Sequence, residues 1–148
     1  MINRELIRIK AVQLTYAYFQ NGNHNIDNAE KELVFSLSKS YHLYNYLLQL
    51  IVEVTKMARK HLEVASARAQ REGQPVPSSK FVDNKLAFQL EINKMLQEFY
   101  DGQKHIWEDN IEYVKKLYLQ IEASDIYKEY MNDADNSYEA DRELWRKI

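Results

Sequence analysis

The chain has 148 residues, of which 45% are apolar and 28% are charged, and its formal net charge is -2. This length and composition are typical of one globular domain with a sizeable core. The absence of cysteine excludes disulfides, thiolate metal sites and cysteine nucleophiles, and it fits a reducing, cytoplasmic location. No apolar run approaches the roughly 20 residues that span a bilayer, so we expect no membrane partner.

Few residues in the chain break helices. It holds only 3 glycines and 2 prolines, all of them in short polar stretches. Long segments without these residues favour helices over strands and turns. We therefore predict a single all-α region over residues 1–148, built as a helical bundle of six or seven helices with a long third helix.

Three helices are predicted in the first half. The first covers residues 3–20 and stops at Asn21-Gly22-Asn23, where Gly22 can adopt the left-handed conformation of a helix C-cap. Asp27 and Glu30 resemble a capping box that opens a second helix at residues 28–39. The third helix covers residues 41–72, where apolar residues recur at helical spacing.

The second half begins with a loop at residues 72–80, which holds both prolines. A fourth helix is predicted at residues 81–100 and a fifth at 104–123. Ser124 and Ser137 can cap two short final helices. The fifth helix carries apolar residues at alternating spacings of four and three, which predicts a packing seam: Trp107, Ile111, Val114, Tyr118 and Ile121.

The last predicted helix stops at Ile148 while Leu144 and Trp145 still require burial. We therefore expect this chain to be the front part of a longer protein. An exposed apolar patch, or a homodimer that covers it, would follow from the missing partner surface.

Two arginines, Arg4 and Arg8, lie one turn apart in the first helix, on a strip that continues to Ala11 and Thr15. The planar guanidinium group binds phosphates through two hydrogen bonds and stacks on bases. The alternative is a solvated or ion-paired edge of a helix that is otherwise buried through Leu6, Ile9, Leu14 and Tyr16. Both interpretations place the arginines at the surface.

The string RELIRIKAVQLTYAYFQ resembles the opening helix of the NusB transcription antitermination factors. That helix carries spaced arginines, then Ala-Val-Gln, a tyrosine, a further aromatic residue and a glutamine. Here the tyrosine, the aromatic residue and the glutamine are Tyr16, Tyr18 and Gln20. A looser resemblance extends to about residue 56, which leaves residues 57–148 as a helical extension and the second NusB-like half absent.

The resemblance implies a function. NusB proteins are all-helical, bind the boxA element of ribosomal RNA transcripts and act with NusE, a small-subunit ribosomal protein, in the RNA polymerase antitermination complex. By resemblance, Arg4 and Arg8 would hold boxA-type RNA, and Lys10 would assist from another side of the helix.

Other features of the sequence suggest weaker candidate sites. Residues 56–71 carry five cations against Glu63, and Lys56, Arg59 and Lys60 form a second basic face for phosphates, although a solvated face is the simpler interpretation. His105, Glu108 and Glu112 share a helix face, but no second set of ligands completes a metal site. No phosphate loop or catalytic triad appears, so we expect no enzymatic activity, no cofactor and no bound metal.

Two other functions stay open. The first is a non-catalytic helical module that binds another protein through its apolar faces. The second is the RNA-binding front domain of a ribosomal RNA methyltransferase, since such enzymes can carry NusB-like domains.

Overall fold

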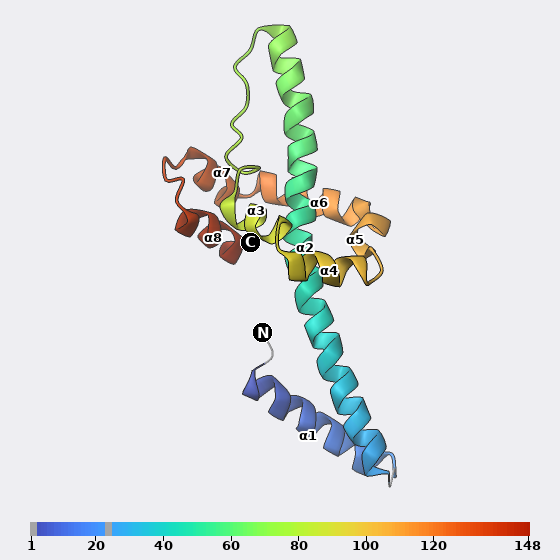
Figure 1. Ribbon diagram of the computed structural model, residues 1–148. Helices are drawn as coiled ribbons and strands as arrows, with labels where there is room; N and C mark the ends of the chain where they lie inside the picture. Colours follow the sequence, from blue (N-terminus) through green and yellow to red (C-terminus); the bar gives the residue numbers. More distant parts are fainter. Residues whose placement is uncertain (1–2, 23–24) are drawn as a thin grey trace. The chain divides into compact units, whose positions relative to one another are not determined.

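The computed structural model describes residues 3–22 and 25–148 (Figure 1). Every regular element in these ranges is an α-helix, which confirms the all-α prediction. The chain divides into two compact units, the first ending at Leu47 and the second covering Leu48–Ile148. In the described ranges, no helix combines the length and the apolar character needed to cross a membrane.

The first unit contains α1 (Arg4–Gln20) and the beginning of α2 (Ile26–Glu72). The side chain of Asn3 caps α1, because its Oδ1 accepts a hydrogen bond from the Leu6 amide at 2.8 Å. Gly22 follows the end of α1 with a φ of 61°, the left-handed conformation predicted for it. Asn23, the last residue of the predicted break, lies outside the described residues, as do Ile2 and His24.

A single helix of 47 residues, α2, replaces the second and third helices predicted from the sequence. The predicted break near residue 40 is wrong because residues 36–46 contain neither glycine nor proline, so nothing in them ends a helix. The long helix is therefore the second helix of the chain. It begins earlier than predicted: Asn25 Oδ1 accepts from the amides of Asp27 at 3.0 Å and Asn28 at 3.2 Å, in place of a capping box at Asp27.

The prediction that α1 is buried through Leu6, Ile9, Leu14 and Tyr16 is wrong. None of its residues is buried. Leu6 and Leu14 are partly buried, whereas Ile9 is 47% exposed and Tyr16 66% exposed. The sequence pattern correctly marked α1 as rich in apolar residues, but in this chain those residues form an exposed surface.

The second unit contains six shorter helices and the part of α2 that begins at Leu48 (Figure 1). The helices are α3 (Lys85–Glu91), α4 (Lys94–Asp101), α5 (Ile106–Asp109), α6 (Ile111–Ala123), α7 (Asp125–Asn132) and α8 (Tyr138–Lys147). Their core is one cluster of buried side chains from four helices and the segment before α3: Val54, Ala58, Phe81, Val114, Tyr118, Ile121, Tyr130 and Leu144. The seam predicted on α6 is confirmed at its three buried positions, while Ile111 is exposed.

Asparagines interrupt both of the long helices predicted in the second half, so the described ranges hold eight helices rather than six or seven. Asn84 caps α3 through the Ala87 amide at 3.0 Å, and Asn93 caps α4 through the Leu96 amide at 3.0 Å. Asn110 separates α5 from α6, and its side chain donates to the Ile106 carbonyl at 2.8 Å. An asparagine side chain competes with the helix for backbone hydrogen bonds, which explains these breaks.

A buried polar network joins α3, α7 and α8. The Tyr130 hydroxyl donates to Asp141 Oδ1 at 2.6 Å, and the Lys85 amide donates to Asp141 Oδ2 at 2.8 Å. Asn84 Nδ2 donates to the Asp141 carbonyl at 3.4 Å. Because Asp141 is only 3% exposed, the hydrogen bonds from Tyr130 and Lys85 replace the water that its carboxylate loses on folding.

The final helix is better buried than the sequence suggested. Leu144 is 3% exposed, and the ring centroid of Trp145 lies 5.6 Å from that of Phe81. Exposed apolar side chains occur in both units, and in the first unit Phe19 and Ile26 are each 74% exposed.

Candidate nucleic-acid interface

The cationic start of α1 is accessible to a ligand. Arg4 and Arg8 are exposed and Lys10 is partly buried. Among the described residues, no carboxylate forms an ion pair with any of the three. Arg4 and Arg8 lie at positions i and i+4, so their guanidinium groups share one face of the helix, whereas Lys10 projects from a different side.

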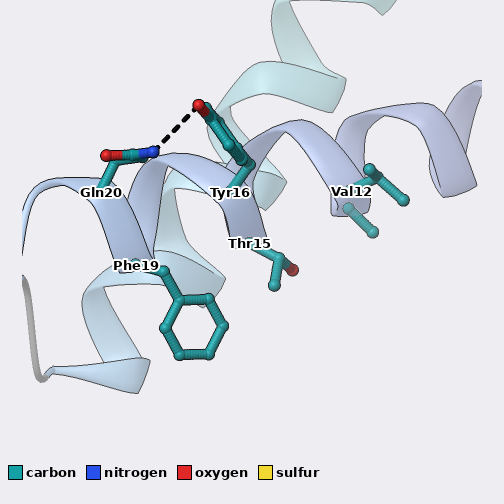
Figure 2. A pocket seen from close by; sticks show the side chains of 6 residues that line it. Val12, Thr15, Tyr16, Phe19 and Gln20 are labelled. Carbon is teal, nitrogen blue, oxygen red and sulfur yellow. Dashed lines mark hydrogen bonds between the residues drawn. The ribbon is translucent and has the colours of Figure 1, made fainter.

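An apolar hollow lies on α1, and Figure 2 draws the side chains that line it. Ala11 and Thr15, which continue the strip of Arg4 and Arg8, line it. Tyr16 and Phe19, which also line the hollow, project from α1 in different directions, and Gln20 Nε2 donates to the Tyr16 hydroxyl at 3.0 Å (Figure 2). One face of α1 therefore passes from two cations to an apolar surface bordered by aromatic rings.

A second hollow within the first unit lies between α1 and the beginning of α2. Leu14, Tyr18 and Phe19 contribute to it from α1, and Ile26 and Leu33 from α2. The rings of Tyr18 and Phe19 are 5.5 Å apart in an edge-to-face arrangement. The first unit thus presents apolar side chains on two sides of α1.

The second basic face is largely neutralised by carboxylates. Lys56 Nζ lies 2.9 Å from Glu53, and an Arg59 guanidinium nitrogen lies 3.2 Å from Glu91. The hydrogen bond to Glu91 raises the pKa of Arg59. Lys60 is exposed and forms no ion pair with any described residue. This face therefore offers a phosphate fewer unpaired cations than the start of α1 does.

The predicted histidine cluster does not gather on one helix. His105 Nδ1 lies 3.2 Å from Glu108, whereas Glu112 belongs to the separate helix α6. Across residues 3–22 and 25–148, no three or more metal-ligating side chains come together. Burial raises the pKa of Tyr118, and the Glu122 carboxylate, which accepts a hydrogen bond from its hydroxyl at 3.0 Å, raises it further.

Comparison of the chain with known protein families, with characterised proteins and with solved structures finds no match. The resemblance to NusB proteins therefore depends on the residues of α1 and the first part of α2. The contact boundary between the units falls between Leu47 and Leu48, and the looser resemblance extends a little beyond it.

Sequence reasoning found the arginine strip but not the hollow that continues it. The sequence did indicate the position of the hollow, because Ala11 and Thr15 lie on the same helical strip as Arg4 and Arg8. It was missed because a helix this rich in apolar residues was expected to bury Tyr16 within a bundle.

Proposed function

We propose that this protein is an RNA-binding transcription antitermination factor of the NusB type, and that the start of α1 holds the phosphates of a boxA-type RNA. The proposal rests on Arg4 and Arg8, which share one exposed face and form no ion pair with a described carboxylate. Phosphate binding requires such unpaired cations, because it draws its affinity from the release of counterions. The sequence resemblance supplies the class of RNA.

The proposal also assigns partners. NusE and the RNA polymerase antitermination complex would be reached through apolar surface of the first unit, where Val12, Tyr16 and Phe19 are exposed. Aromatic residues are enriched in the centres of protein interfaces, which supports this assignment.

The decisive experiment measures binding of a boxA-like RNA at several salt concentrations by the wild type and by an Arg4→Ala/Arg8→Ala variant. Each phosphate contact to a single strand contributes about 0.7 to the slope of log affinity against log salt, so removing two should reduce its magnitude by roughly 1.4. Thermal stability should hardly change, since replacing exposed side chains costs about 0.5 kcal/mol or less.

A control with the same change in net charge is Arg68→Ala/Arg71→Ala, which removes two cations of another exposed helix face, where Arg68 pairs with Glu72 at 2.8 Å. It should leave the slope unchanged. Unchanged affinity and slope in the Arg4→Ala/Arg8→Ala variant would contradict an RNA-binding role for α1. A large fall in melting temperature would show instead that the arginines stabilise the fold.

The exposed apolar surface of the first unit also favours a second candidate function, a helical module that binds proteins alone. Val12 is 69% exposed and Phe19 74% exposed, far more than expected for side chains that only stabilise a fold. Titration with purified NusE, with and without RNA, separates the two functions. If a Phe19→Glu variant no longer binds NusE but still binds RNA, the hollow is the site of protein binding.

A further inference from the structure

The first unit carries a row of exposed apolar side chains on α1. Ile9, Val12, Tyr16 and Phe19 follow one another at spacings of three, four and three residues, and they are 47%, 69%, 66% and 74% exposed. At about 100° per residue, the four positions fall within an arc of about 80° on one side of the helix. Such alternating spacings are typical of the seam between two paired helices. We call these four residues the α1 seam.

The beginning of α2 leaves the α1 seam exposed. Leu14 and Tyr18 line the hollow between the two helices, whereas Val12 and Tyr16 line the hollow on the other side of α1. Among the described residues of the first unit, Asn45 alone is buried, so this unit has no apolar core of its own. A helix that is apolar around most of its circumference is normally covered by other helices. The α1 seam therefore calls for a partner from outside the first unit.

The order of side chains along the α1 seam fits a second copy of α1 that runs in the opposite direction. In an antiparallel pair centred on Leu14, Ile9 lies opposite Phe19 of the second copy. Val12 lies opposite Tyr16 in the same way. Each aliphatic side chain then faces an aromatic ring, and such alternation of small and large residues fills the space between helices. A parallel pair would instead place each aromatic ring opposite its own copy.

The charges of the first unit favour the same direction. Its charged side chains, histidines aside, lie in two segments of opposite sign and at Lys39, which is farther along α2. The start of α1 has three cations and one carboxylate, a net charge of +2: Arg4, Glu5, Arg8 and Lys10. The start of α2 has three carboxylates and one cation, a net charge of -2: Asp27, Glu30, Lys31 and Glu32.

The acidic segment lies beside the end of α1, because Glu30 lines the same hollow as Tyr18 and Phe19. An antiparallel pair therefore brings the basic start of each α1 towards the acidic segment of the other copy. A parallel pair would bring segments of like charge together, which opposes association. The two ends of the first unit are thus complementary to each other in a symmetric pair.

The size of the α1 seam fits a weak dimer. An aromatic side chain buries roughly 150–250 Å² when it is covered, so the exposed parts of the four seam residues amount to on the order of 400 Å² per copy. A symmetric pair would remove roughly twice this area from water, and Thr15 and Gln20, which line the same hollow as the seam, would add to it. Interfaces below about 1,200 Å² are typical of weak association, so we expect a dissociation constant of roughly 1–100 μM.

We propose that the α1 seam binds α1 of a second copy of this chain, in an antiparallel pair with two-fold symmetry centred near Leu14. The pairing itself does not depend on RNA binding. One consequence rests on the proposed function: NusE and RNA would use the same face of α1, so they bind the monomer and the dimer is the form that holds neither.

Sedimentation velocity of the full chain, without RNA or NusE, tests the pairing. The wild type should change from monomer to dimer as its concentration rises. Val12→Glu places a carboxylate opposite an aromatic ring and should weaken the dimer about tenfold or more. Val64 is 72% exposed on the part of α2 in the second unit, so Val64→Glu is the matched control and should leave the dimer unchanged. Circular dichroism should show both variants folded, because both positions are exposed.

Introduced cysteines test the direction of the pair, since the chain has no cysteine of its own. A mixture of Ile9→Cys and Phe19→Cys chains should form the mixed disulfide under mild oxidation. Ile9→Cys alone should not form a disulfide, because in an antiparallel pair its two copies are offset by about 15 Å along the helices. A disulfide requires Cα atoms within about 7 Å of each other. Mass spectrometry identifies the products.

Two results would overturn the proposal: a wild type that stays monomeric well above the expected dissociation constant, or a dimer that Val12→Glu does not weaken. An Ile9→Cys disulfide as abundant as the mixed one would overturn the antiparallel direction. A monomer that binds purified NusE through Phe19 would assign the α1 seam to that partner instead. None of these results decides RNA binding, which the salt dependence of the Arg4→Ala/Arg8→Ala variant tests separately.

Discussion

The two units of this chain use their apolar residues in different ways. In the second unit, helices from four regions bury a common core, and side chains cap most of the helix starts. In the first unit, α1 is as rich in apolar residues but buries none of them. Apolar content alone therefore does not show whether a helix builds a core or an exposed surface within its own unit.

The largest expected effect comes from comparing two phenylalanines. Phe81 is 2% exposed in the second unit and Phe19 is 74% exposed in the first. Phe81→Ala should lower the free energy of unfolding by about 3–5 kcal/mol, because it leaves a cavity in the core. Phe19→Ala should change it by about 0.5 kcal/mol or less. Urea denaturation followed by circular dichroism measures both, and similar losses would remove the distinction between the units.

A smaller effect is expected from the buried network of the second unit. Tyr130→Phe removes one of the hydrogen bonds to the buried Asp141 carboxylate and should cost about 1–3 kcal/mol. Tyr113 is 69% exposed, so Tyr113→Phe is the matched control and should cost almost nothing. Equal melting temperatures for the two variants would mean that a water molecule replaces the Tyr130 hydroxyl without loss of stability.

The smallest expected effect is a dependence of stability on alkaline pH, which comes from buried tyrosines of the second unit. Burial raises the pKa of both Tyr118 and Tyr130 above the usual value near 10, and their carboxylate partners add to the shift. Because the unfolded chain loses these protons first, the contribution of the two tyrosines to stability should be constant below about pH 9 and fall above it, by on the order of 1 kcal/mol at pH 10.5. Chemical denaturation across this range, compared with Tyr118→Phe, measures the contribution. If the free energy of unfolding of Tyr118→Phe falls with pH as steeply as that of the wild type, Tyr118 makes no such contribution.

Sequence reasoning predicted local features well and tertiary ones poorly. Ser124 and Ser137 were expected to cap helices, and their hydroxyls accept from Tyr127 and Ala140 as predicted. The interruptions at Asn93 and Asn110 were missed because the apolar pattern continues through them. A side chain that prefers to bond to the backbone has no signature in hydrophobic spacing.

The candidate site also has features that the sequence predicts and others that only the fold shows. The shared face of Arg4 and Arg8 follows from helical spacing, which the sequence contains. The pairing of Arg59 with Glu91, by contrast, joins residues that are 32 positions apart, and no local pattern indicates it. The sequence alone therefore could not show which of the two basic faces has unpaired cations.

The positions of the two tryptophans have a spectroscopic consequence. Trp107 and Trp145 are the only tryptophans of the chain, and both pack against the core of the second unit. Tryptophan emission will therefore report the folding of that unit and remain insensitive to the helicity of α1. Emission and circular dichroism followed in one denaturation should diverge wherever the first unit unfolds separately.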